Sequence, residues 1–259
     1  MDFIDTHCHL DSILERLEAP DFADYRSRFL PAGFRGCVTI SCHPASIGAT
    51  LALMREEGVH GAFGIHPHDA KSYGDELESE LVSAMADPKS VAWGEIGLDY
   101  HYTMSPPDVQ REVFARQIRK GVELEKPLII HTREAEAETL EILKQEAPRD
   151  WKIHVHCFTS SPDMAYKLLE GFPNLCLGFT GIVTFKNAQE LQEVVKATPL
   201  ERILLETDGP YLAPVPHRGK PAHSGHIPFI ADKIAELKKA PVETVYRQTR
   251  INTRRIYGI

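Results

Sequence analysis

Histidines and carboxylates follow several short apolar runs of this sequence, a pattern typical of ligands for divalent metal ions. His7 and His9 come directly after the apolar segment 2–6, and Glu95 stands between two glycines at the end of a later run. On an extended chain, residues two apart point the same way, so the two imidazoles can converge on one ion. Later runs end in three further candidate ligands, which are His131, His156 and Asp208.

Four imidazoles and two carboxylates form a ligand set large enough for two divalent ions. Imidazole with carboxylate suits Zn²⁺, Mn²⁺, Fe²⁺, Co²⁺ or Ni²⁺, whereas Mg²⁺ prefers oxygen ligands. Paired ions lie ~3.5–4 Å apart and need a bridging ligand, for which Glu95 is the natural candidate. We expect two ions per subunit and leave Zn, Mn, Mg, Co and Ni open. A lone histidine at a strand end is more often an ordinary polar residue, but five separate runs with ligand-type residues at the same end favour a metal site.

The elements that position these residues are predicted to alternate between strand and helix. Eight short runs rich in Val, Ile and Phe predict strands at 2–6, 34–42, 59–65, 91–96, 127–131, 152–156, 175–181 and 202–207. They recur about every 25 to 35 residues, the length of a βα unit. Amphipathic segments between them, such as 107–125, have helical periodicity.

This alternation predicts a single domain over residues 1–259, an α/β protein with a (β/α)8 TIM barrel. All six candidate ligands then lie at the carboxyl ends of strands, where barrel enzymes build their sites. An open doubly wound sheet is the alternative, but it would need a glycine-rich phosphate loop after the first strand. The segment 5–9, Asp-Thr-His-Cys-His, is nothing like such a loop.

Three more residues are candidates for contact with a substrate. His66 follows the third predicted strand and faces the same rim, where it could touch substrate or transfer a proton. Arg133 and Arg218 could each bind a phosphate in bidentate fashion, or could instead form surface salt bridges. We expect the remaining histidines of this region to be solvated or ordinary loop residues: His68, His223 and His226.

Composition limits the partners and the surroundings of the protein. With 42% apolar and 25% charged residues, the 259-residue chain is an ordinary globular protein. Its net charge of −8 argues against coating nucleic acid through a basic face, but not against an enzyme that acts on short, single-stranded or end-bound substrates. Five cysteines without a CxxC pair suit a reducing compartment, and no apolar run approaches the ~18 residues of a membrane span. We expect a cytoplasmic protein that does not enter membranes; the oligomeric state stays open, and a monomer is compatible with the sequence.

Several long motifs resemble the TatD family of metal-dependent deoxyribonuclease-like hydrolases, within the amidohydrolase superfamily of metal barrels. The matching segments are FIDTHCHLD (3–11), FGIHPH (63–68), GEIGLDYHY (94–102), PLIIHTREA (127–135), HVHCF (154–158), GFTGIVTFKNA (178–188) and LLETDGPYLAPVPHRGK (204–220). The sequence departs from the family pattern at 221–228, where an Asn-Glu-Pro-like stretch is expected. That segment should border the substrate, so the resemblance leaves substrate preference undecided.

The resemblance implies a barrel fold and a role for each ligand. His7 and His9 would bind one ion with Asp208, His131 and His156 would bind the other, and Glu95 would bridge the two.

The implied activity is that of a DNase, a hydrolase that cleaves phosphodiester bonds from the 3′ end by means of a water activated by two metals. Asp208 is our candidate to accept the proton from that water. The alternative is a metal-dependent ester or amide hydrolase, such as an aminoacyl-tRNA deacylase, which could use the same ligands. Superfamily members with that chemistry often bridge their metals through a carboxylated lysine, and the run that ends at Glu95 has none. A catalytically silent metal-binding protein is a third, weaker alternative.

Overall fold

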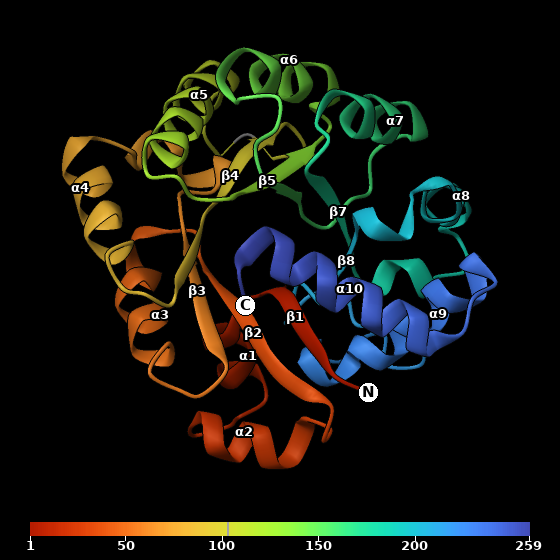
Figure 1. The fold of residues 1–259 in the computed structure, drawn as a ribbon. Helices are drawn as coiled ribbons and strands as arrows, with labels where there is room; N and C mark the ends of the chain where they lie inside the picture. The colour runs from red at the N-terminus through yellow and green to blue at the C-terminus, as the bar shows by residue number, and fades with distance from the viewer. Residues whose placement is uncertain (103) are drawn as a thin grey trace.

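Eight parallel strands follow one another around a barrel in the computed structural model, which describes residues 1–102 and 104–259 (Figure 1). Each strand pairs in parallel with the next one along the chain. Their bounds are β1 Phe3–Cys8, β2 Phe34–Ser41, β3 Val59–Phe63, β4 Ser90–Asp99, β5 Leu128–Arg133, β6 Ile153–Val155, β7 Leu175–Phe179 and β8 Ile203–Leu205. The predicted (β/α)8 barrel and all eight of its strands are therefore confirmed.

The largest difference from the predicted strands is at β4, which continues to Asp99 instead of ending at residue 96. Its last residues still pair with β5, with Leu98 opposite Thr132 and Asp99 opposite Arg133. Glycines in this stretch interrupt the apolar pattern on which the prediction rested. The longer strand takes a second carboxylate to the rim of the barrel.

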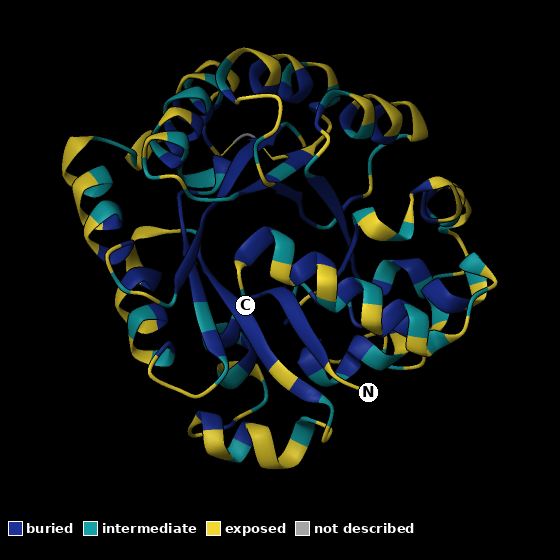
Figure 2. Cartoon of the chain, viewed as in Figure 1, coloured by how far each residue is buried: buried dark blue, intermediate teal, exposed yellow. Residues whose placement is uncertain are grey.

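Helices surround the strands and bury their inner faces, as Figure 2 shows by the dark inner and yellow outer sides of the ring. They are α1 Leu10–Arg16, α2 Phe22–Phe29, α3 Ile47–Leu53, α4 Asp75–Ala84, α5 Pro107–Glu123, α6 Glu136–Glu146, α7 Pro162–Gly171, α8 Gln189–Ala197, α9 Ile227–Lys238 and α10 Val242–Tyr257. In α5, the buried face includes Val113, Phe114 and Ile118, at helical spacing. Among the described residues, no helix is both long enough and apolar enough to span a membrane.

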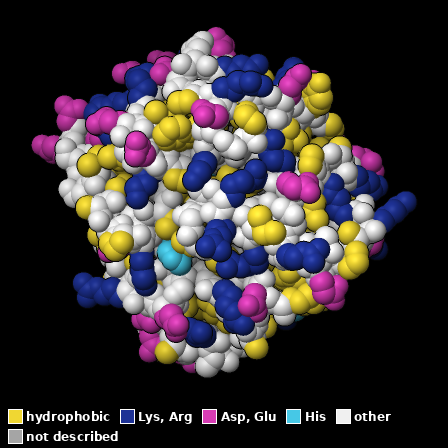
Figure 3. Space-filling view, viewed as in Figure 1, with side chains coloured by type: hydrophobic (Ala, Val, Ile, Leu, Met, Phe, Trp, Pro, Cys, Tyr) yellow, Lys and Arg dark blue, Asp and Glu magenta, His cyan; other side chains and the backbone are white. Residues whose placement is uncertain are grey.

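The barrel interior is filled by apolar side chains and closed at one end by α10. This helix packs against β1 and β8, and its last turn adds Ile256 and Tyr257 to the interior cluster (Figure 1). Lys and Arg side chains gather in the middle of the face that carries α10 (Figure 3). The net charge of −8 is therefore not spread evenly over the molecule.

At the other end, backbone hydrogen bonds join β1 to the chain that follows β8. The amide of Asp208 donates to the carbonyl of His7 at 2.9 Å, and the amide of His9 donates to the carbonyl of Gly209 at 2.8 Å. A single bridge between Cys8 and Gly209 completes this seam. Closure of the barrel thus places Asp208 directly beside His7 and His9.

Candidate metal centre

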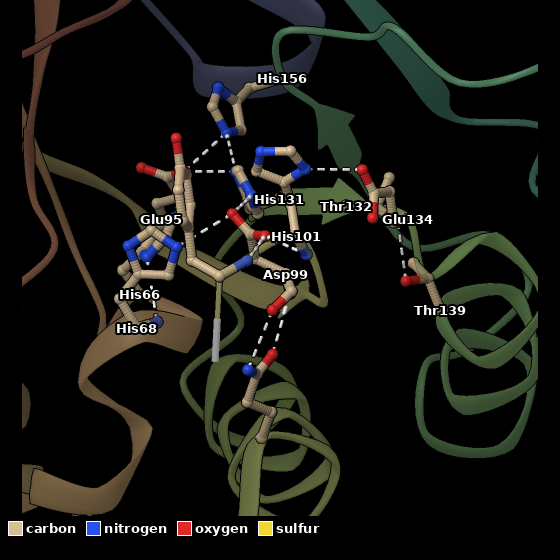
Figure 4. Close-up of polar contacts among 12 residues, drawn as sticks. His66, His68, Glu95, Asp99, His101, His131, Thr132, Glu134, Thr139 and His156 are labelled. Carbon is tan, nitrogen blue, oxygen red and sulfur yellow. Dashed lines mark hydrogen bonds and ion pairs between the residues drawn. The ribbon is translucent and has the colours of Figure 1, made fainter. Parts of the chain in front are cut away.

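The carboxylate of Glu95, on β4, lies at the centre of a group of imidazoles (Figure 4). Its Oε1 is 2.6 Å from His156 Nε2, 3.0 Å from His131 Nδ1 and 3.6 Å from His66 Nε2. Its Oε2 is 3.6 Å from His7 Nε2. Glu95 is only 2% exposed, so its carboxylate itself is largely shielded from water.

Asp208 completes the group from the other side of the barrel seam. Its Oδ1 is 3.5 Å from His9 Nε2 and 3.6 Å from His7 Nε2. In the described part of the chain, four sets of donor atoms are close enough to hold an ion, and two of them share Glu95: one has His7, His9 and Glu95, the other Glu95, His131 and His156. The structure therefore brings together all six predicted ligands, with Glu95 common to these two sets.

Unpartnered nitrogens show that the residues present fit metal ions. Among the described residues, both ring nitrogens of His7 and Nδ1 of His156 are buried without a hydrogen-bond partner. Buried polar atoms are normally hydrogen-bonded, so such atoms in a cluster of ligand-type residues need another partner. A divalent ion provides one, and imidazole with carboxylate is a donor set for ions such as Zn²⁺ or Mn²⁺.

Metal binding needs neutral imidazole and ionised carboxylate. Burial alone would lower the pKa of His9, His131 and His156, but the neighbouring carboxylates raise it, so these three rings must lose a proton when an ion binds. Burial lowers the pKa of His7 to about 3, so this ring is neutral at pH 7. Burial alone would raise the pKa of Glu95, but the charge of His156 and the other nearby imidazoles lower it well below its usual value. Burial would also raise the pKa of Asp208, but the contact with His9 and the charges of His7 and His156 together outweigh it and lower the pKa. Both carboxylates are therefore ionised.

Asp99 is part of the site and was not predicted from the sequence. Its Oδ2 lies 3.3 Å from His131 Nε2 and 3.0 Å from His68 Nε2. The prediction that His68 is simply solvated was wrong, because its side chain is only 23% exposed and pairs with this carboxylate. Asp99 was missed because the strand was predicted to end too early. The signal was nevertheless present, since residues 95, 97 and 99 alternate onto one face of an extended chain.

A second unpredicted carboxylate, Glu206, lies beneath the centre. Its Oε2 is 2.9 Å from His154 Nε2, and its other oxygen accepts a hydrogen bond from the amide of Cys157. Burial raises the pKa of Glu206 to about 8, so this carboxyl group is mostly protonated at neutral pH. His154 Nδ1 in turn lies 2.5 Å from the hydroxyl of Tyr257, on α10. The contacts from Glu206 through His154 to Tyr257 thus link the site to the helix that closes the barrel.

Comparison with known proteins decides the family. The family model described as TatD related DNase matches residues 4–258. The chain belongs to the TatD family. A human protein named 3'-5' RNA nuclease TATDN2 is 42% identical over 267 residues, which cover 99% of this chain but only 35% of the human protein. This TatD-family chain therefore spans about a third of that relative's length.

Bacterial relatives match the chain over almost their whole length. A protein of Escherichia coli strain K12 named uncharacterized metal-dependent hydrolase YcfH is 37% identical over 261 residues, covering 100% of this chain and 97% of the relative. The crystal structure of YjjV, a TatD homologue from Escherichia coli K12, superimposes with a TM-score of 0.87 at 25% identity, over 99% of this chain and 98% of the other. A TatD-family hydrolase from Entamoeba histolytica has the same fold, with a TM-score of 0.81 at 19% identity over 99% and 98% of the two chains. The protein is an enzyme, a metal-dependent hydrolase of the TatD family.

Helix α5 holds two rim segments of this hydrolase through buried glutamines. The side chain of Gln117 accepts from the amide of Ile65 at 2.8 Å and donates to its carbonyl at 3.0 Å. Gln110 makes the same pair of bonds to the backbone of Asp99, at 2.9 and 3.0 Å. The segments that carry His66 and Asp99 are therefore fixed by side chains that, in a sequence, resemble ordinary surface residues of a helix.

The two predicted phosphate-binding arginines lie in different places. Arg133 lines the cavity above the centre, which has a volume of about 600 Å³, and its guanidinium lies 5.1 Å from the ring centroid of Tyr102. Arg218 lines a separate cavity and lies 4.2 Å from the ring centroid of Phe185. Neither arginine is in a salt bridge among the described residues. The structure thus brings His66 and Arg133 to the main cavity but not Arg218.

The unusual segment 221–228 is folded against the barrel and is not an open loop. His226 is only 4% exposed and its ring lies 3.9 Å from that of His223, so these two histidines are packed rather than solvated. Among the described residues, neither lines the main cavity, in agreement with the prediction that they do not form a substrate wall. The hydroxyl of Ser224 donates to the buried carboxylate of Asp5 at 2.8 Å. The segment is therefore held against β1 through Asp5.

Proposed function

We propose that this hydrolase cleaves phosphodiester bonds of nucleic acid and removes nucleotides from the 3′ end, with two divalent ions at the centre. The observation that carries the proposal is the shared position of Glu95, whose carboxylate belongs to two sets of candidate ligands. A carboxylate between two ions is the arrangement that two-metal phosphodiesterases need. The family description DNase and the human relative's name as an RNA nuclease support nucleic acid as the substrate.

Each ligand has one role in this proposal. His7, His9 and Asp208 would hold one ion, His131 and His156 would hold the other, and Glu95 would be shared by both. When bound, the ions lower the pKa of a water molecule to near neutrality and offset the negative charge of the phosphate oxygens.

The protein's own groups position the reactants. In this proposal Asp208 accepts a proton from the attacking water; its lowered pKa and its side chain, 13% exposed, support that role. Burial and the charge of His131 lower the pKa of His66 well below its usual value, so the neutral ring contacts the substrate and does not supply a proton. Arg133, exposed at the edge of the cavity, pairs with a phosphate.

To test this, the metal-reconstituted protein is given single-stranded DNA and RNA oligonucleotides of the same sequence, each labelled at the 5′ or the 3′ end, and their hydrolysis is followed. We expect Mn²⁺-dependent release of 3′ nucleotides, with DNA as the substrate predicted from the sequence. Glu95→Gln, which keeps the shape of the side chain, is the matched control and should lose the activity. Turnover of carboxylic esters or aminoacyl-tRNA with no cleavage of either oligonucleotide would instead support the ester and amide hydrolase alternative.

A further inference from the structure

A second cavity, of about 510 Å³, opens beside the metal centre. Its polar and aromatic lining comes from Arg16 on α1, Phe185, Tyr211, Arg218 and Lys220. Tyr211 and Leu212 line both this cavity and the main one, so the two are neighbours across a shared wall. The volume is within the range of ~300–1,000 Å³ typical of small-ligand sites.

The second cavity is basic although the protein as a whole is acidic. Among the described residues, no aspartate or glutamate lines it, and its three cations form no salt bridge with a carboxylate. By contrast, the main cavity is lined by Asp69, Glu95, Asp99 and Asp208. Unpaired cations in a chain of net charge −8 indicate an anionic ligand.

The cations alternate with aromatic rings. The guanidinium of Arg16 lies 5.1 Å from the ring centroid of Tyr211, and that of Arg218 lies 4.2 Å from Phe185. Tyr211 is 48% exposed, and its ring lies 6.1 Å from the ring of the candidate metal ligand His9. Positive charge for phosphates combined with exposed aromatic faces for bases is how proteins bind single-stranded nucleic acid without reading its sequence.

We infer that this second cavity binds the nucleotides adjoining the one that is released, so that a single strand passes from the metal centre over Tyr211 into the basic groove. The inference rests on the proposed function and extends it to the length and strandedness of the substrate. Arg16 and Lys220 pair with successive phosphates, and Tyr211 stacks on a base at the shared wall. A dinucleotide reaches only the metal centre, whereas a longer single strand also occupies the groove.

The experiment compares kcat/KM for a single-stranded octanucleotide with kcat/KM for a dinucleotide of the same end sequence. We expect the wild type to favour the octanucleotide roughly tenfold or more, because each stacked base and each phosphate contact adds to binding. The double substitution Arg16→Ala and Lys220→Ala should remove most of that preference. It should also make the slope of log binding constant against log salt concentration shallower by about 0.7 for each lost phosphate contact. Tyr211→Ala should lower the preference, and Tyr211→Phe, which keeps the ring, should retain it.

Arg149→Ala is the matched control. This arginine is exposed, precedes β6 at the amino ends of the strands, and forms no salt bridge among the described residues. The proposal is overturned if the wild type degrades oligonucleotides but the groove variants lower kcat/KM equally for the octanucleotide and the dinucleotide, or lower it for neither. Failure of the wild type to hydrolyse any nucleic acid, with ester turnover intact, would overturn the proposed function as well.

Discussion

Asp99 Oδ2 lies 3.3 Å from Nε2 of His131, and the other ring nitrogen of His131 lies 3.0 Å from Glu95 (Figure 4). The imidazole is therefore held between a carboxylate behind it and the metal centre in front. Such a carboxylate fixes the proton on the rear nitrogen and leaves the front nitrogen free to bind a metal. The relationship makes Asp99 a positioning residue for the ion that His131 and His156 would hold.

Asp99→Asn should weaken metal binding, because the neutral amide holds the His131 ring less firmly and makes this imidazole a poorer metal ligand. We expect roughly a 10- to 100-fold loss of affinity, the usual effect of removing such an outer partner. Competition with a chelator of known affinity measures this loss. Asp69→Asn is the control, since Asp69 lines the same cavity but its carboxylate contacts none of the described ligands. Equal affinities of the two variants would contradict the positioning role.

Tyr257→Phe should destabilise the fold without touching the rim. The substitution removes the hydroxyl 2.5 Å from His154 Nδ1 and leaves that buried nitrogen without a partner. We expect a decrease of about 1–3 kcal/mol in the free energy of unfolding, measured by denaturant titration. Tyr166→Phe, at a position 64% exposed, should change stability by less than about 0.5 kcal/mol. A Tyr257→Phe variant as stable as the wild type would show that the bond contributes nothing.

The free energy of unfolding should decrease as the pH is lowered below 6.5, partly because of His226. Burial lowers the pKa of His226 to about 3, and the neighbouring charges of His223 and His217 act in the same direction. In the unfolded chain this histidine has its ordinary pKa of 6.5 and is protonated below that pH, whereas in the folded chain it stays neutral. The folded state therefore loses stability as pH falls from 6.5 toward 3.

His226→Gln removes this group and should make the melting temperature less sensitive to pH below 6.5. Thermal unfolding of both proteins at half-unit steps measures the two slopes. Above pH 7.5 the slopes should coincide, which serves as the internal control. Parallel curves throughout the acid range would show that His226 is not held neutral in the folded protein.

The parts of this molecule that sequence reasoning predicted are those controlled by short-range periodicity. The eight strands have the alternation or the continuous apolar character of buried parallel strands, and His7 and His9 stand two apart on an extended chain. The carboxyl ends of all eight strands meet at one rim, so the position of a residue along its strand was enough to bring six ligands together.

The parts that were missed depend on contacts across the barrel. Asp99 looked like a loop residue because glycines at 94 and 97 break the apolar pattern of its strand. Glu206 and His154 meet only because β6 and β8 both approach β7, where Gly178 leaves room for their side chains. The location of Arg218 in the second cavity depends on the path of the chain after β8, and this segment has neither helical nor strand periodicity from which its path could be predicted.

The most direct test of a two-metal hydrolase is the number of ions bound per chain, measured beside activity. Metal-free protein would be titrated with Mn²⁺ while bound metal and release of nucleotides from a single-stranded oligonucleotide are followed together. We predict two equivalents per chain, activity that rises with their binding, and loss of both bound metal and activity in Glu95→Gln. Full activity with no bound metal, or a Glu95→Gln variant that binds two ions and remains active, would contradict the account.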